Sequence, residues 1–146
     1  MTELVKSVYH FSKAMNKILI VEDDWALYNL YKTELMLANY QVSNVADGNL
    51  ATDAVKVQKP DLVLLDLMLP GKNGLEILQE IRADDAAKDT KVVMLTNFGD
   101  EENVSTALEY GALDYIMKYK IVPEELSNKV AAILGDQSKS TVSVTN

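Results

Sequence analysis

The 146-residue sequence contains no cysteine and only one histidine, His10. The lack of cysteine excludes disulfide bonds and thiol chemistry, and it is typical of proteins in a reducing cytoplasm. A single histidine argues against a histidine-based metal site and against a Ser-His-Asp triad. No apolar run is long enough to cross a bilayer, and the N-terminus has no apolar core followed by a cleavage site. We therefore expect a cytoplasmic protein without a membrane partner.

Basic residues are also scarce, since 14 lysines and arginines stand against 22 aspartates and glutamates, which makes the net charge −8. A surface that binds nucleic acid needs a basic patch to neutralise phosphates. The charge therefore predicts that nucleic acid is not a partner. At 48% hydrophobic residues, the chain has enough apolar side chains for one domain with a full core.

Five short segments rich in branched apolar residues have the pattern of buried strands. They cover residues 17–21, 41–46, 62–66, 91–95 and 113–117. Each is followed by a helical pattern, and these helices begin near residues 24, 48, 74, 100 and 123. Strands that alternate with helices predict an α/β domain over residues 17–135, with a parallel sheet covered by helices on both faces.

The two ends of the chain lie outside this pattern. Residues 1–16 carry apolar side chains at helical spacing, namely Leu4, Val8, Phe11 and Met15. This N-terminal extension either forms a short amphipathic helix that packs on the domain or on a second subunit, or it is an upstream stretch before a natural start at Met15. Residues 136–146 are polar and rich in serine and threonine, which predicts a tail or the beginning of a linker.

Polar residues stand where four of the predicted strands end. Glu22 and Asp23 follow the first, Asp66 ends the third, Thr96 follows the fourth and Lys118 follows the fifth. The carboxyl ends of parallel strands meet at one edge of the sheet, where open α/β sheets bind ligands. Three carboxylates crowded there repel one another unless a cation joins them, and oxygen ligands suit Mg²⁺. One carboxylate can then accept a phosphoryl group whose oxygens bind a lysine and a threonine hydroxyl.

These residues lie in motifs that resemble the receiver domain of bacterial two-component response regulators, in particular single-domain receivers of the chemotaxis type. The motifs are ILIVEDD at residues 18–24, PDLVLLDLMLPG at 60–71, Thr96, and GALDYIMK at 111–118. The resemblance covers residues 17–134, nearly all of the predicted globular part. It implies a flavodoxin-like, doubly wound fold with five parallel strands in the order 2-1-3-4-5.

The resemblance also implies a role for each acid of the cluster. Asp66 is expected to be the phosphoacceptor. Glu22 and Asp23 are expected to hold Mg²⁺ together with Asp66 and the backbone carbonyl of Met68. Mg²⁺ is the only cofactor that the resemblance implies.

Further positions are expected to bind the phosphoryl group or to respond to it. Thr96 and Lys118 match the switch hydroxyl and the phosphate-binding lysine, and Tyr115 matches an aromatic residue that changes rotamer when the threonine moves. Tyr119 replaces the proline that usually follows the lysine through a cis peptide. Because a cis bond before a non-proline residue costs roughly 2.5–4 kcal/mol, we expect a trans bond and a reshaped loop. Asn97 stands where a small residue is usual, and we expect it to alter access to the phosphoryl group.

By resemblance, the chain is expected to take a phosphoryl group from a sensor histidine kinase or a histidine phosphotransfer protein. It would then switch a surface that binds a downstream protein, formed by the helix near residue 100, the strand at 113–117 and the helix that begins at Pro123. Apart from self-phosphorylation and self-dephosphorylation, no enzyme activity is expected, and a phosphatase with an aspartate nucleophile would need an acid where Met68 stands. The alternative is a degenerate receiver that works as a phosphorylation-independent interaction module.

Overall fold

Five parallel strands form the middle layer of the structure, a computed structural model that describes residues 15–97 and 99–135. The strands are β1 (Lys17–Val21), β2 (Gln41–Val45), β3 (Leu62–Asp66), β4 (Val92–Thr96) and β5 (Asp114–Met117). They pair in the order β2-β1-β3-β4-β5. This confirms the predicted flavodoxin-like sheet. The predictions for the tail and for all but the last two residues of the N-terminal extension lie outside the described residues.

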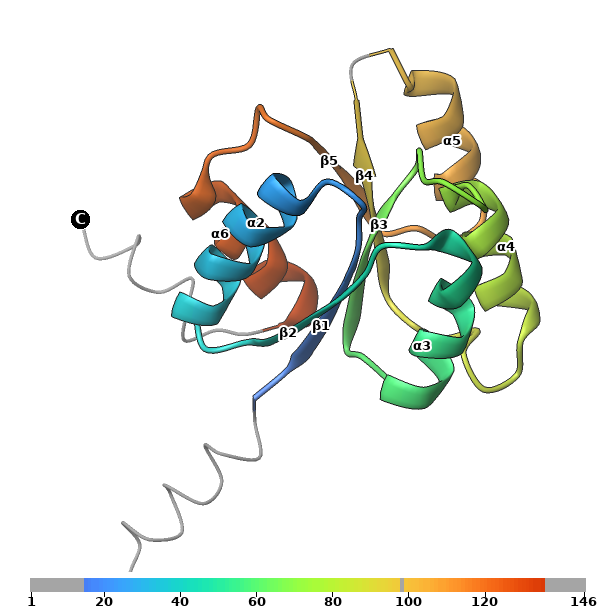
Figure 1. Cartoon of the computed structure of the whole chain (residues 1–146), viewed down its shortest axis with the longest axis horizontal. Coiled ribbons are helices and arrows are strands. Elements are labelled where there is room, and N and C mark those ends of the chain that lie inside the picture. Colours follow the sequence, from blue (N-terminus) through green and yellow to red (C-terminus); the bar gives the residue numbers. More distant parts are fainter. Residues whose placement is uncertain (1–14, 98, 136–146) are drawn as a thin grey trace, which may run out of the picture.

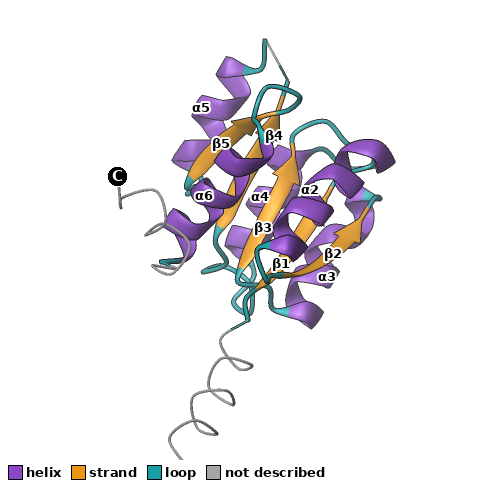
Figure 2. Cartoon of the chain, turned by 90° about the vertical axis from the view of Figure 1, so that its left-hand side faces the viewer, coloured by secondary structure: helices purple, strands orange, loops and turns teal. Residues whose placement is uncertain are grey.

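Helices cover both faces of this sheet (Figures 1 and 2). They are α2 (Trp25–Leu37), α3 (Ala51–Gln58), α4 (Gly74–Ala83), α5 (Glu101–Glu109) and α6 (Pro123–Leu134), with a short 3₁₀ turn, η1 (Gly48–Leu50), before α3. Helices α2 and α6 lie together on one face, while α3, α4 and α5 lie on the other. Among the described residues, no helix is long and apolar enough to cross a membrane.

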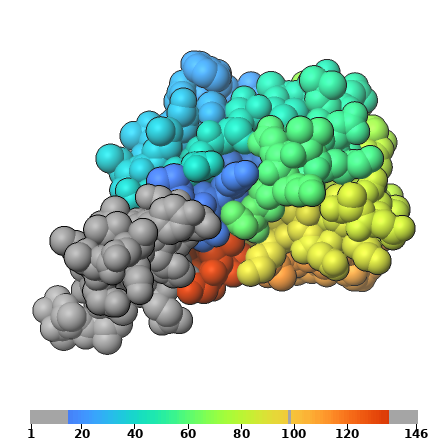
Figure 3. Space-filling view, turned by 90° about the horizontal axis from the view of Figure 1, so that it is seen from below, coloured from blue at the N-terminus to red at the C-terminus, as the bar shows by residue number. Residues whose placement is uncertain are grey.

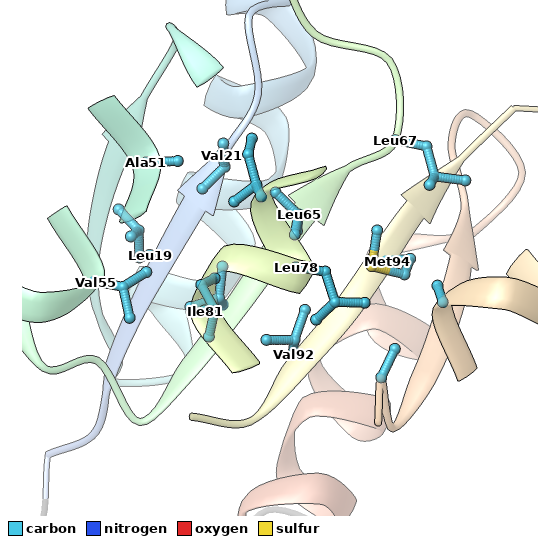
Figure 4. Packing of buried hydrophobic residues seen from close by; sticks show 14 of the residues in the cluster. Leu19, Val21, Ala51, Val55, Leu65, Leu67, Leu78, Ile81, Val92 and Met94 are labelled. Carbon is cyan, nitrogen blue, oxygen red and sulfur yellow. The ribbon is translucent and has the colours of Figure 1, made fainter. Parts of the chain in front are cut away.

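Each face of the sheet has its own core because successive side chains of a strand point to opposite sides. Ile18 and Ile20 of β1 pack with α2 and α6, whereas Leu19 and Val21 pack with α3 and α4. Figure 4 shows the second of these cores, in which Val55 and Ile81 from the helices meet side chains of β1, β3 and β4. Every residue of β3 and β4 is buried, which explains their continuous apolar sequences.

Local features set where the helices begin and end. Asp24 caps α2, and its Oδ1 accepts a hydrogen bond of 3.1 Å from the backbone N–H of Leu27. Asn73 caps α4 in the same way through the N–H of Glu76. Gly111 follows α5 with a φ of 85°, a left-handed conformation that favours glycine. Because all the strand pairs are parallel, the strands end along the same edge of the sheet (Figure 2), and Figure 3 shows the molecule from below.

Candidate functional site

Three carboxylates converge at the carboxyl edge of the sheet. Glu22 and Asp23 follow β1, and Asp66 is the last residue of β3, which pairs directly with β1. One carboxylate oxygen from each residue lies within 4.8 Å of the other two. Glu22 and Asp66 are buried, whereas Asp23 is exposed to solvent. The structure thus brings together the three acids that the sequence places at this edge.

The ammonium group of Lys118 lies between two of these acids. Its Nζ is 2.6 Å from Glu22 Oε1 and 2.7 Å from Asp66 Oδ2. The lysine side chain is only 7% exposed, so its charge is largely shielded from water. Its position is set by β5, because the backbone N–H of Lys118 donates a 2.8 Å hydrogen bond to the carbonyl of Thr96 at the end of β4. The lysine therefore closes the acid cluster from the side of β5.

Burial and charge shift the ionisation of this group of residues. Burial raises the pKa of Glu22 to about 7, and the charge of Asp66 acts in the same direction. The Asp24 backbone N–H and Lys118 act in the opposite direction but do not outweigh burial. For Lys118, burial disfavours the ammonium form, yet hydrogen bonds and charges from Asp66 and Glu22 prevail and raise its pKa. Lys118 therefore carries its charge at neutral pH, while Glu22 is partly protonated.

The cluster fits a hard divalent cation. Glu22 Oε1 and Asp66 Oδ2 are buried, and their one partner among the described residues is the Lys118 ammonium. A carboxylate oxygen has more than one lone pair, so each of these oxygens can accept a further ligand beside the ammonium. Carboxylate oxygens are the donors that Mg²⁺ prefers. Asp24 stays outside the set, because its Oδ1 caps α2 and its Oδ2 accepts the hydroxyl of Tyr119.

The loop after β3 is held close to the site. The backbone N–H of Met68 donates to Asp66 Oδ1 at 3.0 Å, which fixes the carboxylate. Lys72 in the same loop forms an ion pair with Glu80 of α4. The loop also lies against η1, where a Cβ on Gly48 would be 2.1 Å from the Lys72 carbonyl oxygen. Only glycine therefore permits this close approach.

Thr96 ends β4, and Tyr115 lies within the neighbouring strand β5. The buried Thr96 hydroxyl is 3.5 Å from the carbonyl oxygen of Ile116, at the limit of a hydrogen bond. A cavity of about 350 Å³ adjoins Thr96 and is lined by residues of α5, including Val104. Tyr115 lines the same cavity and is 43% exposed. Thr96 and Tyr115 therefore border one cavity.

The two positions that depart from the family pattern lie in loops beside the site. Asn97 is exposed, and its backbone N–H donates to Asp100 Oδ2 at 3.0 Å. No cis peptide occurs in the described residues, so the expected trans bond before Tyr119 is confirmed. Tyr119 has a φ of 64°, and its hydroxyl donates to Asp24 Oδ2. The loop after Lys118 is therefore attached to the start of α2.

One tyrosine contact at this site could not be predicted from the sequence. The contact between Tyr119 and Asp24 joins residues 95 positions apart. Its only sequence signals are a third consecutive acid after β1 and a tyrosine in place of proline.

Comparison with known proteins gives clear relatives. The chain is 42% identical over 118 residues to the DNA-binding response regulator MtrA of Mycobacterium tuberculosis, across 81% of this chain and 50% of that protein. It is 35% identical over 130 residues to the probable transcriptional regulator ycf27 of Cyanophora paradoxa, across 89% of this chain and 53% of that protein. The chain thus spans about half the length of these curated relatives.

These relatives correct one prediction. The acidic charge led us to expect no nucleic-acid partner, but MtrA is named as a DNA-binding regulator, so that prediction is wrong. The charge describes only these 146 residues. The net charge of these residues says nothing about the other half of a protein such as MtrA, and a basic surface in that half would not change it.

A solved structure and a family model agree on the family. The structure resembles the receiver domain of a sensor histidine kinase from Pseudomonas aeruginosa, which has a magnesium ion in its active site cleft, with a TM-score of 0.75 and 31% identity over 84% of this chain and 100% of that one. The family model described as the response regulator receiver domain matches residues 18–131. The chain therefore belongs to the family of response regulator receiver domains.

Proposed function

We propose that Asp66 accepts a phosphoryl group from a phosphohistidine on a kinase or phosphotransfer protein. The observation that carries this proposal is the position of Asp66, buried at the end of β3 with an ammonium group 2.7 Å from its Oδ2. A carboxylate with a cationic neighbour and two further acids beside it can act as a nucleophile toward phosphorus. Membership of the receiver domain family supports the same role.

In the proposed reaction, a carboxylate oxygen of Asp66 attacks the phosphorus atom. A P–O bond to Asp66 forms while the P–N bond to the donor histidine breaks, and the released imidazole takes up a proton. The Met68 N–H on Oδ1 and the Lys118 ammonium near Oδ2 hold the nucleophile in one orientation. Lys118 also offsets part of the charge of about −1.5 to −2 that the phosphoryl group brings.

We propose that Glu22, Asp23 and Asp66 hold Mg²⁺ together with the backbone carbonyl of Met68. Mg²⁺ bound there would neutralise charge on the phosphoryl oxygens during transfer. The closeness of the three carboxylates supports this assignment, as does the further coordination that the Glu22 and Asp66 oxygens can offer beside Lys118. The magnesium ion in the related kinase receiver domain supports the choice of metal.

Phosphorylation would then act on Thr96. Its present hydrogen bond to Ile116 is weak, and a phosphoryl group on Asp66 would offer a stronger, charged acceptor. Moving the Thr96 side chain toward Asp66 would free space beside the cavity that Tyr115 borders. We propose that Tyr115 turns into this cavity and that the surface over α5, β5 and α6 changes shape. Two arrangements of these elements would thus be biased by one covalent group.

The output of this change is a separate part of the proposal. A DNA-binding relative that matches this chain over only half of its own length supports control of a module that binds DNA. The surface over α5, β5 and α6 would transmit the phosphorylation state of Asp66 to that module. Asn97, exposed beside Thr96, would modulate how long the phosphoryl group survives.

The proposal is tested by incubating the chain with Mg²⁺ and a small phosphodonor such as acetyl phosphate. Intact mass should show one added phosphoryl group on the wild type and none on Asp66→Asn. Adding a chelator should prevent the gain in mass on the wild type. If the wild type takes up no phosphoryl group, the degenerate, phosphorylation-independent receiver is the better description.

A further inference from the structure

We propose that Tyr119 is a positioning residue that clasps the loop after β5 to the start of α2 and thereby holds Lys118 against the acid cluster. This inference rests on the proposed function, because Lys118 matters there as the group that meets the phosphoryl oxygens. The Tyr119 hydroxyl bonds to Asp24, whereas Lys118 is the residue that pairs with Glu22 and Asp66. Tyr119 would act through the lysine that precedes it.

The clasp consists of one hydrogen bond with a rigid acceptor. The Tyr119 hydroxyl donates to Asp24 Oδ2. The other oxygen, Oδ1, accepts the backbone N–H of Leu27 and so belongs to the cap of α2. Because both oxygens of Asp24 are engaged, the carboxylate has a fixed orientation. Tyr119 is therefore linked to the start of α2 through a side chain whose orientation is fixed.

The backbone of the loop needs such an attachment. Tyr119 has a φ of 64°, a left-handed conformation that is unfavourable for a residue with a Cβ. Such conformations persist where the surrounding structure determines them. On one side of Tyr119 the Lys118 N–H bonds to the Thr96 carbonyl, and on the other the Lys120 N–H bonds to the Met117 carbonyl. The clasp adds a third fixed point, at the tip of the Tyr119 side chain.

The consequence concerns the two ion pairs of Lys118. The lysine enters from β5, while Glu22 and Asp24 lie on the loop between β1 and α2. By joining Tyr119 to Asp24, the clasp sets the separation between these two loops and therefore the reach of the ammonium group. The hydrogen bond between Tyr119 and Asp24 thus takes the place of the proline that usually follows this lysine in receiver domains. Without this bond, the ammonium would sample positions away from Glu22 and Asp66.

The first test compares Tyr119→Phe with wild type. The substitution removes only the hydroxyl, and Tyr119 is 68% exposed, so the fold should be retained. With acetyl phosphate and Mg²⁺, phosphorylation of Tyr119→Phe should be about three- to tenfold slower at saturating donor, as expected for weakening one charged hydrogen bond. Tyr110→Phe is the matched control, because Tyr110 is exposed at the end of α5, and it should react like wild type.

A second readout is independent of phosphorylation. In ¹⁵N-labelled, metal-free protein at low temperature, the Lys118 ammonium signal should be sharp in wild type and broadened by solvent exchange in Tyr119→Phe. Asp24→Ser keeps an oxygen to cap α2 but cannot reach Tyr119, so it should broaden the same signal. If both residues act through one bond, the double variant should behave like the more affected single variant.

The outcomes separate the two proposals. An unchanged ammonium signal together with an unchanged rate in Tyr119→Phe would overturn the clasp. Additive effects of Tyr119→Phe and Asp24→Ser would overturn it as well. If wild type takes up no phosphoryl group, the proposed function fails, and the ammonium signal alone then decides whether Tyr119 positions Lys118.

Discussion

Replacing Glu22 by glutamine tests the electrostatics of the site. In the metal-free protein, burial raises the pKa of Glu22 to about 7, from 4.5 in an unstructured chain. Between these two pH values the folded protein binds a proton that the unfolded chain has already released. Stability therefore falls as pH rises from 4.5 toward 7, and this loss is complete above pH 7. Glutamine keeps the shape of the side chain and removes this titration.

The magnitude follows from the size of the pKa change. One pKa unit corresponds to about 1.4 kcal/mol, so ionising Glu22 costs up to roughly 3 kcal/mol more in the folded state than in the unfolded state. At pH 5 the glutamate is neutral in the folded protein and resembles glutamine. At pH 8 it is ionised beside Asp66, and the Asp24 N–H and Lys118 offset only part of the cost of its burial. Relative to wild type, Glu22→Gln should thus gain up to roughly 3 kcal/mol of stability between pH 5 and pH 8.

Urea unfolding in the presence of a chelator measures this difference. Wild type and Glu22→Gln are unfolded at several pH values from 5 to 8, and the free energies of unfolding are subtracted at each pH. Titrations elsewhere in the chain largely cancel in the subtraction. A difference that stays constant across this range, or one that favours wild type increasingly at high pH, would refute the argument that burial governs Glu22.

Three further predictions concern the surroundings of the site. Asp23→Asn should weaken Mg²⁺ binding about tenfold or more, because it removes a charged oxygen ligand. The fluorescence of Trp25, the single tryptophan, should report the Mg²⁺ titration, and an unchanged midpoint would show that Asp23 does not bind the metal. Gly48→Ala should lower the free energy of unfolding by about 1–3 kcal/mol, because the added Cβ meets the Lys72 carbonyl; a wild-type melting curve would contradict this close approach. Arg82→Ala should lower the free energy of unfolding in urea by about 2–4 kcal/mol, because Arg82 donates to four backbone carbonyls. Arg82→Lys should restore little of this stability, since an ammonium cannot span the same acceptors.

Much of the fold could be predicted because burial on both faces leaves a direct mark in the sequence. Strands β3 and β4 have no exposed position and are apolar up to their last residues, Asp66 and Thr96, so their apolar runs could be recognised without a partner strand. The acid cluster followed from topology alone, since parallel strands bring Glu22, Asp23 and Asp66 to one edge whatever the details of packing.

What the sequence could not provide was the detail of loops. The tyrosine at position 119 indicated a trans bond, but its left-handed φ and its bond to Asp24 depend on where two distant loops meet. The close approach of Gly48 to the Lys72 carbonyl in the loop after β3 joins distant parts of the chain, and no local pattern encodes it. The error about nucleic acid arose because net charge describes the residues present and not a longer relative.

The most direct test of the central claim is to locate the phosphoryl group on the chain. After reaction with acetyl phosphate and Mg²⁺, borohydride reduces an aspartyl phosphate to homoserine and releases phosphate, and peptide mass spectrometry then identifies the residue. The account predicts homoserine at position 66 in wild type and at no position in Asp66→Asn. Homoserine at Asp23, or labelling of Asp66→Asn at the wild-type rate, would contradict it.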